Sequence, residues 1–305
     1  MTVQALKNQI IKAKKETGTL ILAHTYQSPD ILDIADVTGD SFALSQAAEK
    51  VDAKRVLMCG VRFMAETVKI LSPEKTVLLS HSRAGCPMAE QISPDRVRDF
   101  RAEHPDVAVC AYINTTAALK TQADVCVTSS TAIKIVSRMP QKDILFIPDK
   151  NLGAYVQKQL PEKNIILWDG YCHVHNSVTP ELILKMKAEH PNAKVAIHPE
   201  CRPDCVALAD MAGSTKAIID YALSNEEEII FITERGVCDK LSRDFPNRKF
   251  HQLESELLTC EDMKLTKLEQ VLNTLAGKGG EEISMDEATR LAAKRPIDAM
   301  LHYGG

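Results

Sequence analysis

Residues 20–41, "LILAHTYQSPDILDIADVTGDS", decide the fold because two later stretches repeat their pattern. These are "AVCAYINTTAALKTQADVCVTS" at 108–129 and "VAIHPECRPDCVALADMAGST" at 195–215, so the period is about 87 residues. Each opens as a short apolar strand and ends at a small hydroxyl residue. An Ala-Asp dipeptide keeps the same spacing, at residues 35–36, 123–124 and 209–210. Agreement at a fixed period predicts a chain built from three similar units.

The segments between these stretches also repeat. "SPDRVRDFRAEHP" (93–105) and "TPELILKMKAEHP" (179–191) begin like helices, with a hydroxyl N-cap followed by Pro in the first turn. Further apolar runs follow at 55–60, 143–148 and 228–233, and then "TVLLSHSRAGC", "NIILWDGYC" and a weaker "KFHQLESELLTC". Apolar strands that alternate with helices predict parallel β-α-β layers. We therefore expect an α/β fold of three pseudo-threefold-related α/β/α domains, with short parallel sheets around a central active-site cavity.

The repeat also sets the expected domain limits. They are 1–88, 89–176 and 177–264. The remaining segment, 265–305, contains two helical patterns, "TKLEQVLNTLAGKGG" and "SMDEATRLAAKRPIDAML". We expect this segment to pack back on the first domain and close the ring.

Composition narrows the function classes. The 305 residues are 45% hydrophobic and 26% charged, which is typical of a globular protein. A net charge of -4 without a dense Lys/Arg block argues against a nucleic-acid partner. The absence of a long apolar run or an apolar signal core predicts a soluble, cytoplasmic protein without a membrane partner. Nine cysteines scattered through apolar segments indicate thiols in a reducing compartment.

Polar pairs follow the first strand of each unit. They are His24 and Tyr26, Tyr112 and Asn114, and His198 and Glu200. Residues i and i+2 at a strand end point the same way, and the carboxyl ends of parallel strands are where ligands bind. Any one of these residues is explained equally well as a satisfied core polar group. Six of them at equivalent places predict a shared polar pocket.

Three hydroxyl residues, Ser41, Ser129 and Thr215, stand where a loop enters a helix. Singly, each is expected to act as an ordinary N-cap. Around one axis, hydroxyls and free N–H groups at helix starts form a cradle for anions. This arrangement predicts a small ligand with several anionic groups, held largely by neutral donors.

Cysteines close the three units at matching places. Cys86, Cys172 and Cys260 are spaced 86 and 88 residues apart, so the pseudo-threefold axis should bring their loops together. Three thiolates suit an iron-sulfur cluster with one open iron, which acts as a Lewis acid. Zinc with three Cys ligands and water, or unrelated buried thiols, are the alternatives. Cys201 and Cys205 fall outside the repeat and are expected to be packing thiols.

These residues carry a resemblance along essentially the whole chain. The motifs "AHTYQ", "GDS", "AGCPMA", "AYINTTA", "TSST", "DGYCHVH", "HPEC" and "AGST" resemble the iron-sulfur quinolinate synthase A family. The resemblance implies condensation of iminoaspartate with dihydroxyacetone phosphate to quinolinate in de novo NAD biosynthesis, with release of phosphate and two waters. It implies a [4Fe-4S] cluster on the three repeated cysteines and functional coupling to an L-aspartate oxidase. The segment "LLTCEDMK" lacks the extra cysteines that some members carry, so no disulfide switch is expected there.

The resemblance also implies the substrate site. Its residues are His24, Tyr26, Ser41, Tyr112, Asn114, Ser129, His198, Glu200, Ser214 and Thr215. His175, three residues after Cys172, is either a substrate contact or a support for the site.

We expect Glu200 to be the general base, with a pKa raised by its apolar surroundings, and Tyr26 and His24 to move protons. An iron-sulfur hydro-lyase acting on a small hydroxy acid and a non-enzymatic cluster protein remain alternatives.

Overall fold

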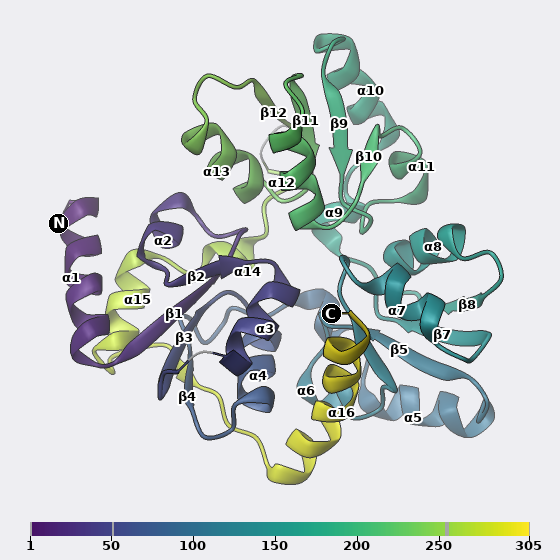
Figure 1. Ribbon diagram of the computed structural model, residues 1–305, viewed down its shortest axis with the longest axis horizontal. Helices are drawn as coiled ribbons and strands as arrows, with labels where there is room; N and C mark the ends of the chain where they lie inside the picture. The colour runs from purple at the N-terminus through teal and green to yellow at the C-terminus, as the bar shows by residue number, and fades with distance from the viewer. Residues whose placement is uncertain (1, 51, 254–255, 305) are drawn as a thin grey trace.

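Three small sheets surround a common centre in the computed structural model, which describes residues 2–50, 52–253 and 256–304 (Figure 1). The strand orders are β2-β1-β3-β4, β6-β5-β7-β8 and β10-β9-β11-β12, so each unit has the same topology. Pairing within each unit is parallel, and β13 adds to β4 as an antiparallel edge. The predicted α/β fold class is confirmed. Glu254 and Ser255, in the segment that was expected to close the third unit, lie outside the described residues.

The central strands form where the sequence has unbroken apolar runs. Helices cover both faces of a parallel sheet, so its inner strands carry apolar residues on both sides. All residues of β5 and of β11 are buried, for example. The strands are β1 Thr19–His24, β2 Val37–Gly39, β3 Arg55–Cys59, β4 Thr76–Leu79, β5 Ala108–Tyr112, β6 Val125–Val127, β7 Asp143–Ile147, β8 Asn164–Leu167, β9 Lys194–Ile197, β10 Met211–Ala212, β11 Ile229–Ile232, β12 Phe250–Gln252 and β13 Glu281–Glu282.

The repeated Ala-Asp dipeptide has a structural role. Each aspartate lies just before the second strand of its unit and accepts a hydrogen bond from a backbone N–H of the first strand. This bond fixes the crossover that returns the chain to the edge of the sheet. The pairs are Asp36 with Ile21 at 2.8 Å, Asp124 with Val109 at 2.7 Å and Asp210 with Val195 at 2.9 Å.

The helices pack on the two faces of each sheet. α5 and α10 begin at the predicted Pro94 and Pro180, although neither preceding hydroxyl makes a capping bond. No helix among the described residues is both long and apolar enough to cross a membrane. The helices are α1 Val3–Glu16, α2 Pro29–Ile34, α3 Ser41–Lys50, α4 Arg62–Leu71, η1 Pro87–Glu90, α5 Pro94–Glu103, α6 Ala117–Lys120, α7 Ala132–Arg138, α8 Lys150–Gln159, α9 His173–Asn176, α10 Pro180–Glu189, α11 Pro203–Val206, α12 Thr215–Ser224, α13 Gly236–Asp244, α14 Glu261–Lys264, α15 Leu268–Leu275 and α16 Glu287–Gly304.

The C-terminal segment divides between two units. α15 and β13 pack on the first unit, as expected. The buried Leu268, Val271 and Leu275 of α15 join the core under α1, and β13 pairs with β4. α16 instead lies mainly against β6 and α6 of the second unit and touches α4 of the first (Figure 1). Its buried face joins a core that the first and second sheets share. The last helix therefore ties these two units together.

Candidate active site

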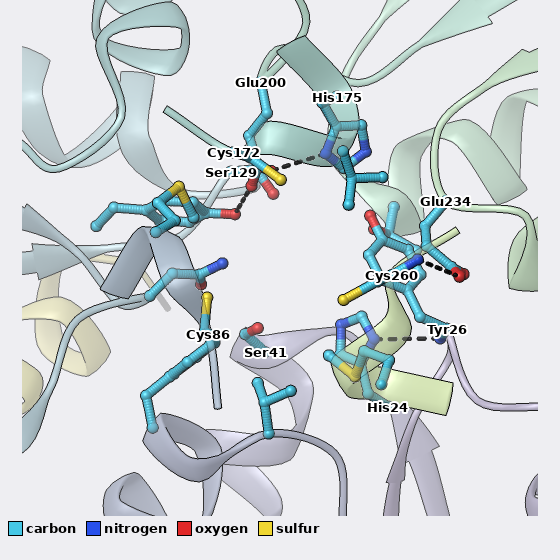
Figure 2. Close-up of a pocket in the computed structure, with 18 of the residues that line it drawn as sticks. His24, Tyr26, Ser41, Cys86, Ser129, Cys172, His175, Glu200, Glu234 and Cys260 are labelled. Carbon is cyan, nitrogen blue, oxygen red and sulfur yellow. Dashed lines mark hydrogen bonds and ion pairs between the residues drawn. The ribbon is translucent and has the colours of Figure 1, made fainter. Parts of the chain in front are cut away.

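Three closing loops carry the repeated cysteines to one central cavity. Cys86, Cys172 and Cys260 all line it, and Figure 2 shows their sulfur atoms directed into the space between the units. Each cysteine is the N-cap residue of a short helix, η1, α9 or α14. In each case the backbone N–H three residues further on faces the sulfur. Such N–H groups favour a negatively charged sulfur, as a metal-bound thiolate is.

Burial opposes ionisation of these thiols. Desolvation raises the pKa of Cys260 to about 12 and raises the pKa of Cys86 and Cys172 still further. The nearby Glu200 adds to the rise in the pKa of Cys172. A metal bound to these cysteines would have to displace the thiol protons, as it does at other cysteine sites.

Two buried carboxylates support the cysteine loops, and the sequence analysis missed both. Asp149 Oδ2 accepts the backbone N–H of Cys172 at 3.0 Å, and Glu234 Oε1 accepts that of Cys260 at 3.3 Å. Both side chains are fully buried. Each acid stands two residues after the third strand of its unit, in "DILFIPD" and "EIIFITE", so the repeat alignment could have revealed them. The first unit has Val61 at this place.

Glu234 also connects the third unit to the first. Its Oε1 lies 2.9 Å from Lys264 Nζ, and Lys264 also donates to the backbone carbonyl of Tyr26. Burial raises the pKa of Glu234, while Lys264 acts in the opposite direction. Gly236, which donates to Glu234 at 2.7 Å, has no room for a side chain, because a Cβ there would lie 2.6 Å from the Tyr26 carbonyl oxygen.

All six strand-end residues line the same cavity, as predicted. His24 and His198 occupy equivalent places, and in each the Nδ1 atom accepts the backbone N–H two residues later, at 3.1 and 3.3 Å. Burial lowers the pKa of both imidazoles to about 3, so they are neutral. Since Nδ1 is an acceptor, the proton resides on Nε2. Both rings therefore present an N–H donor, and that of His198 lies 3.3 Å from Ser129 Oγ.

Glu200 is the buried charged centre of the cavity. Its Oε1 accepts the Tyr112 hydroxyl at 2.6 Å, and its Oε2 lies 2.8 Å from His175 Nδ1, although poorly aligned for a hydrogen bond (Figure 2). Potential metal-ligand atoms of Cys172, His175 and Glu200 lie within 4.8 Å of one another. The second and third units thus contribute to one polar cluster, with a residue of the third unit at its centre.

The expected direction of the Glu200 pKa is wrong. Burial does raise this pKa, but His198, His175 and the Tyr112 hydroxyl together outweigh it and hold the pKa below its ordinary range. Glu200 is therefore ionised at neutral pH. The sequence showed apolar neighbours along the chain, but not the Tyr112 and His175 side chains that the second unit brings to Glu200.

A chain of hydrogen bonds extends from this cluster. His175 Nε2 lies 3.2 Å from Thr233 Oγ1, which lies 3.2 Å from the Tyr26 hydroxyl, and Thr215 donates to that hydroxyl at 3.0 Å. Burial raises the pKa of Tyr26 well above its ordinary value, so the phenol stays protonated. His175 thus lines the cavity and also connects Glu200 to Tyr26.

The hydroxyl residues reach the cavity, but not as helix caps. Ser41, Ser129 and Thr215 line it, whereas Ser214 is absent from the lining and caps α12 by accepting the Ala217 N–H at 3.2 Å. Asp40 accepts the Ala43 N–H at the start of α3, which leaves Ser41 uncommitted to capping. Ser129 precedes α7 by three residues. The expectation of N-capping is therefore wrong for these hydroxyls, because Asp40 and Ser214 cap α3 and α12, and Ser129 lies outside α7, whose N-cap residue is Thr131.

The cavity has no basic side chain of high pKa among the described residues that line it, since neither Lys nor Arg is present there. Asn114 Oδ1 is buried without a hydrogen-bond partner in the described structure. Buried polar atoms are nearly always paired, so an unpaired one in a cavity indicates a ligand contact. Cys201 and Cys205 pack in the core of the third unit, as expected.

The fold and the site define an α/β enzyme with a thiol-lined active-site cavity shared by three similar units. Residues 8–302 match the sequence family described as quinolinate synthetase A protein. The chain is 45% identical over 305 residues to the quinolinate synthase of Caldicellulosiruptor bescii, covering 100% of both chains. It is 46% identical over 295 residues to that of Alkaliphilus metalliredigens, covering 96% of this chain and 97% of the relative. The chain therefore belongs to the quinolinate synthetase A family.

Proposed function

We propose that this chain is a quinolinate synthase of NAD biosynthesis, which condenses iminoaspartate with dihydroxyacetone phosphate. Quinolinate, phosphate and two waters are the products. Family membership over nearly the whole chain is the observation that carries the proposal. The hydro-lyase and non-enzymatic alternatives are not favoured, because the relatives are named for quinolinate synthesis. A neutral-donor cavity with an ionised carboxylate also suits a reaction that moves several protons.

Cys86, Cys172 and Cys260 would hold a [4Fe-4S] cluster. The donor set supports this proposal, since three thiols from separate loops line one cavity and each has a helix N-terminus behind it. Soft thiolates favour iron-sulfur clusters. When bound, a cluster with three protein ligands supplies one open iron as a Lewis acid.

Neutral donors would hold the anionic substrates. The Nε2–H groups of His24 and His198 and the hydroxyls of Ser41 and Ser129 line the cavity. A hydrogen bond from a neutral donor to a charged group contributes about 1.5–3 kcal/mol. The unpaired amide oxygen of Asn114 would accept from a substrate hydroxyl or N–H group.

Glu200 would be the proton acceptor, with Tyr112 and His175 as its immediate relays. It is ionised, and it contacts both the Tyr112 hydroxyl and the His175 ring. Its low pKa makes it a weak base. A negatively charged substrate group nearby would raise that pKa, so proton transfer through Tyr112 or His175 depends on the charge of the bound substrate. Tyr26 would donate rather than accept a proton, because its pKa is raised. His24, with its Nε2 proton, would assist carbonyl isomerisation as a donor.

Anaerobic reconstitution tests the function. We expect the purified chain to contain iron and sulfide in near-equal amounts and to form quinolinate only when both substrates are supplied. Zinc without sulfide would contradict the cluster assignment, and turnover of a hydroxy acid without quinolinate would favour the hydro-lyase.

Cysteine variants separate the metal site from the core. Replacing Cys86, Cys172 or Cys260 by Ala should remove the brown chromophore, whereas Cys201→Ala and Cys205→Ala should keep it, because these two thiols pack away from the cavity. Absorbance near 400 nm and iron content measure the outcome. Loss of the chromophore in the Cys201 or Cys205 variant, with the fold intact, would contradict the proposed ligands.

We also propose a cytoplasmic location, because the nine cysteines are all free thiols, which persist in a reducing compartment. The substrate iminoaspartate is an unstable imine, so an enzyme such as an L-aspartate oxidase that produces it nearby would be functionally coupled.

A further inference from the structure

A second cluster of metal-ligating side chains lies outside the central cavity, on the third unit. His190 follows α10, Glu228 precedes β11, and His251 lies on the edge strand β12. Each of the three residues offers one possible ligand atom, and these three atoms all lie within 4.8 Å of one another. The three residues come from three different elements, so the fold, and not local sequence, brings them together.

The three side chains lie close enough together to share one divalent ion. His251 Nε2 lies 3.0 Å from Glu228 Oε2, and the rings of His190 and His251 stack with centroids 3.6 Å apart and planes 20° from parallel. Ligands at about 2.1 Å from a tetrahedral ion are separated by about 3.4 Å, and an imidazole binds an ion in the plane of its ring, so binding would rotate one ring out of the stack to direct both nitrogens at one ion. Two imidazoles and one carboxylate are a donor set that zinc accepts, with a position left for water.

The backbone does not require a histidine at position 190. Five helices end before a proline in the same backbone conformation, with φ between -127° and -132° and ψ between 66° and 70°. The residues at this place are Ser72, His104, Leu160, His190 and Phe245. A serine, a leucine and a phenylalanine serve equally well, so the turn leaves the His190 side chain available for another role.

His104 is the matched residue of the second unit and shows the difference. Both histidines end the same "AEH" sequence, but the ring of His104 packs on Phe100, with centroids 4.5 Å apart. It belongs to none of the ligand groups found among the described residues. Of the two histidines that end this motif, only His190, in the third unit, therefore lies beside a second histidine and a carboxylate.

Lys249 occupies the other oxygen of the carboxylate. Its Nζ lies 2.6 Å from Glu228 Oε1, and its side chain is 72% exposed. An exposed ion pair of this kind contributes little to stability, so a divalent ion can displace the ammonium group at small cost. The Glu228 and His251 side chains are 28% and 20% exposed, which leaves the cluster open to ions from solvent.

We propose that His190, Glu228 and His251 form a second metal site that binds Zn²⁺ or a similar divalent transition ion. The ion would join the end of α10 to the short edge strand β12, which otherwise pairs only with β11 in the described sheet. His251 precedes Cys260 by nine residues, so the ion would also anchor the chain that leads to the third closing loop. The site is independent of the proposed reaction.

Zinc titration of the cluster-loaded enzyme under anaerobic conditions tests the proposal. With the cluster occupying the three cysteines, calorimetry should show one added Zn²⁺ per chain, and His190→Ala and His251→Ala should each weaken its binding at least ~10-fold. His104→Ala is the matched control and should bind as the wild type does. Lys249→Met should bind Zn²⁺ more tightly, because it removes the competing cation. Quinolinate formation without zinc should be unchanged in all four variants.

Two results would overturn the proposal. One is equal zinc binding by the wild type and His251→Ala, which would place the ion at the thiols or elsewhere. The other is zinc binding that His190→Ala leaves unchanged, or no zinc binding at all. Anomalous scattering from a zinc-soaked crystal provides a direct check that does not depend on how well a variant folds. The expected peak lies between His190, Glu228 and His251, and its absence there counts against the site.

Discussion

Replacing Glu200 by Gln separates proton transfer from binding, because the two side chains are nearly isosteric. Glu200 accepts the Tyr112 hydroxyl at 2.6 Å and lies 2.8 Å from His175 Nδ1. The amide oxygen of Gln can still accept from Tyr112. The substitution removes the negative charge and presents an NH2 group to one of the two partners.

The expected magnitude starts from the Tyr112 hydrogen bond. A hydrogen bond to a charged group contributes about 1.5–3 kcal/mol and a neutral one about 0.5–1.5 kcal/mol, so loss of charge at this bond costs about 1–1.5 kcal/mol. That difference alone is a factor of roughly 5–13 in rate. Loss of a proton acceptor typically costs about 10²–10⁴-fold. We expect turnover to fall by at least ~100-fold, while iron content and substrate binding remain.

Single-turnover quinolinate formation on anaerobically reconstituted protein measures this effect. Asn114→Ala is the comparison variant, and it should raise KM before it lowers kcat, since a neutral contact supplies affinity without taking a proton. Because the pKa of Glu200 is lowered, the carboxylate stays ionised as the pH falls toward about 5, and Glu200 should give no acidic limb near pH 6. Near-wild-type turnover by the Gln variant would refute the assignment of Glu200 as the proton acceptor.

Three further outcomes are expected. Glu234→Gln leaves Lys264 without its buried partner and weakens the hold on the Cys260 loop, so urea unfolding should show a loss of about 1–3 kcal/mol and iron should dissociate faster. Glu281→Gln, which removes a half-exposed ion pair with Arg62, is the control and should cost under about 1 kcal/mol of unfolding free energy. Equal losses of stability in the Glu234 and Glu281 variants would contradict the role of burial. Because burial lowers the pKa of His24 and His198 to about 3, the unfolded chain binds more protons than the folded chain between about pH 6.5 and 3. Stability in that window should therefore fall on acidification by up to about 1.4 kcal/mol per pH unit for each histidine. Urea unfolding at several pH values measures this dependence, and a flat dependence in the unsubstituted protein would be inconsistent with neutral rings. Removal of iron by a chelator should abolish quinolinate formation but leave the far-ultraviolet circular dichroism unchanged, since the apolar cores lie within the sheets; a large loss of helix signal would show that the metal is needed for folding.

The sequence determined the features that depend on pattern along the chain. The period of about 87 residues predicted three similar units, and the buried apolar runs form the predicted strands because strand pairing requires only local propensity and burial. The same period identified the cysteines and the strand-end residues, since equivalent places in repeated units face a common axis. All three cysteines and all six strand-end residues line the cavity.

Only the tertiary structure decided which groups meet across the units. Ser41 and Thr215 have the residue type of helix caps, but Asp40 and Ser214 cap those helices. The support of Cys172 by Asp149 depends on a contact between residues 23 apart. α16 joins the second unit because its apolar face fits the core that the first two sheets share.

Glu200 shows the physical reason most clearly. Its chain neighbours predict a raised pKa, because burial penalises a charge. Tyr112 is 88 residues away, and its hydrogen bond and the adjacent His198 and His175 rings together reverse the sign. Local sequence specifies which side chain is present and how it is buried, whereas its charge state depends on partners that only the folded chain brings within hydrogen-bonding distance.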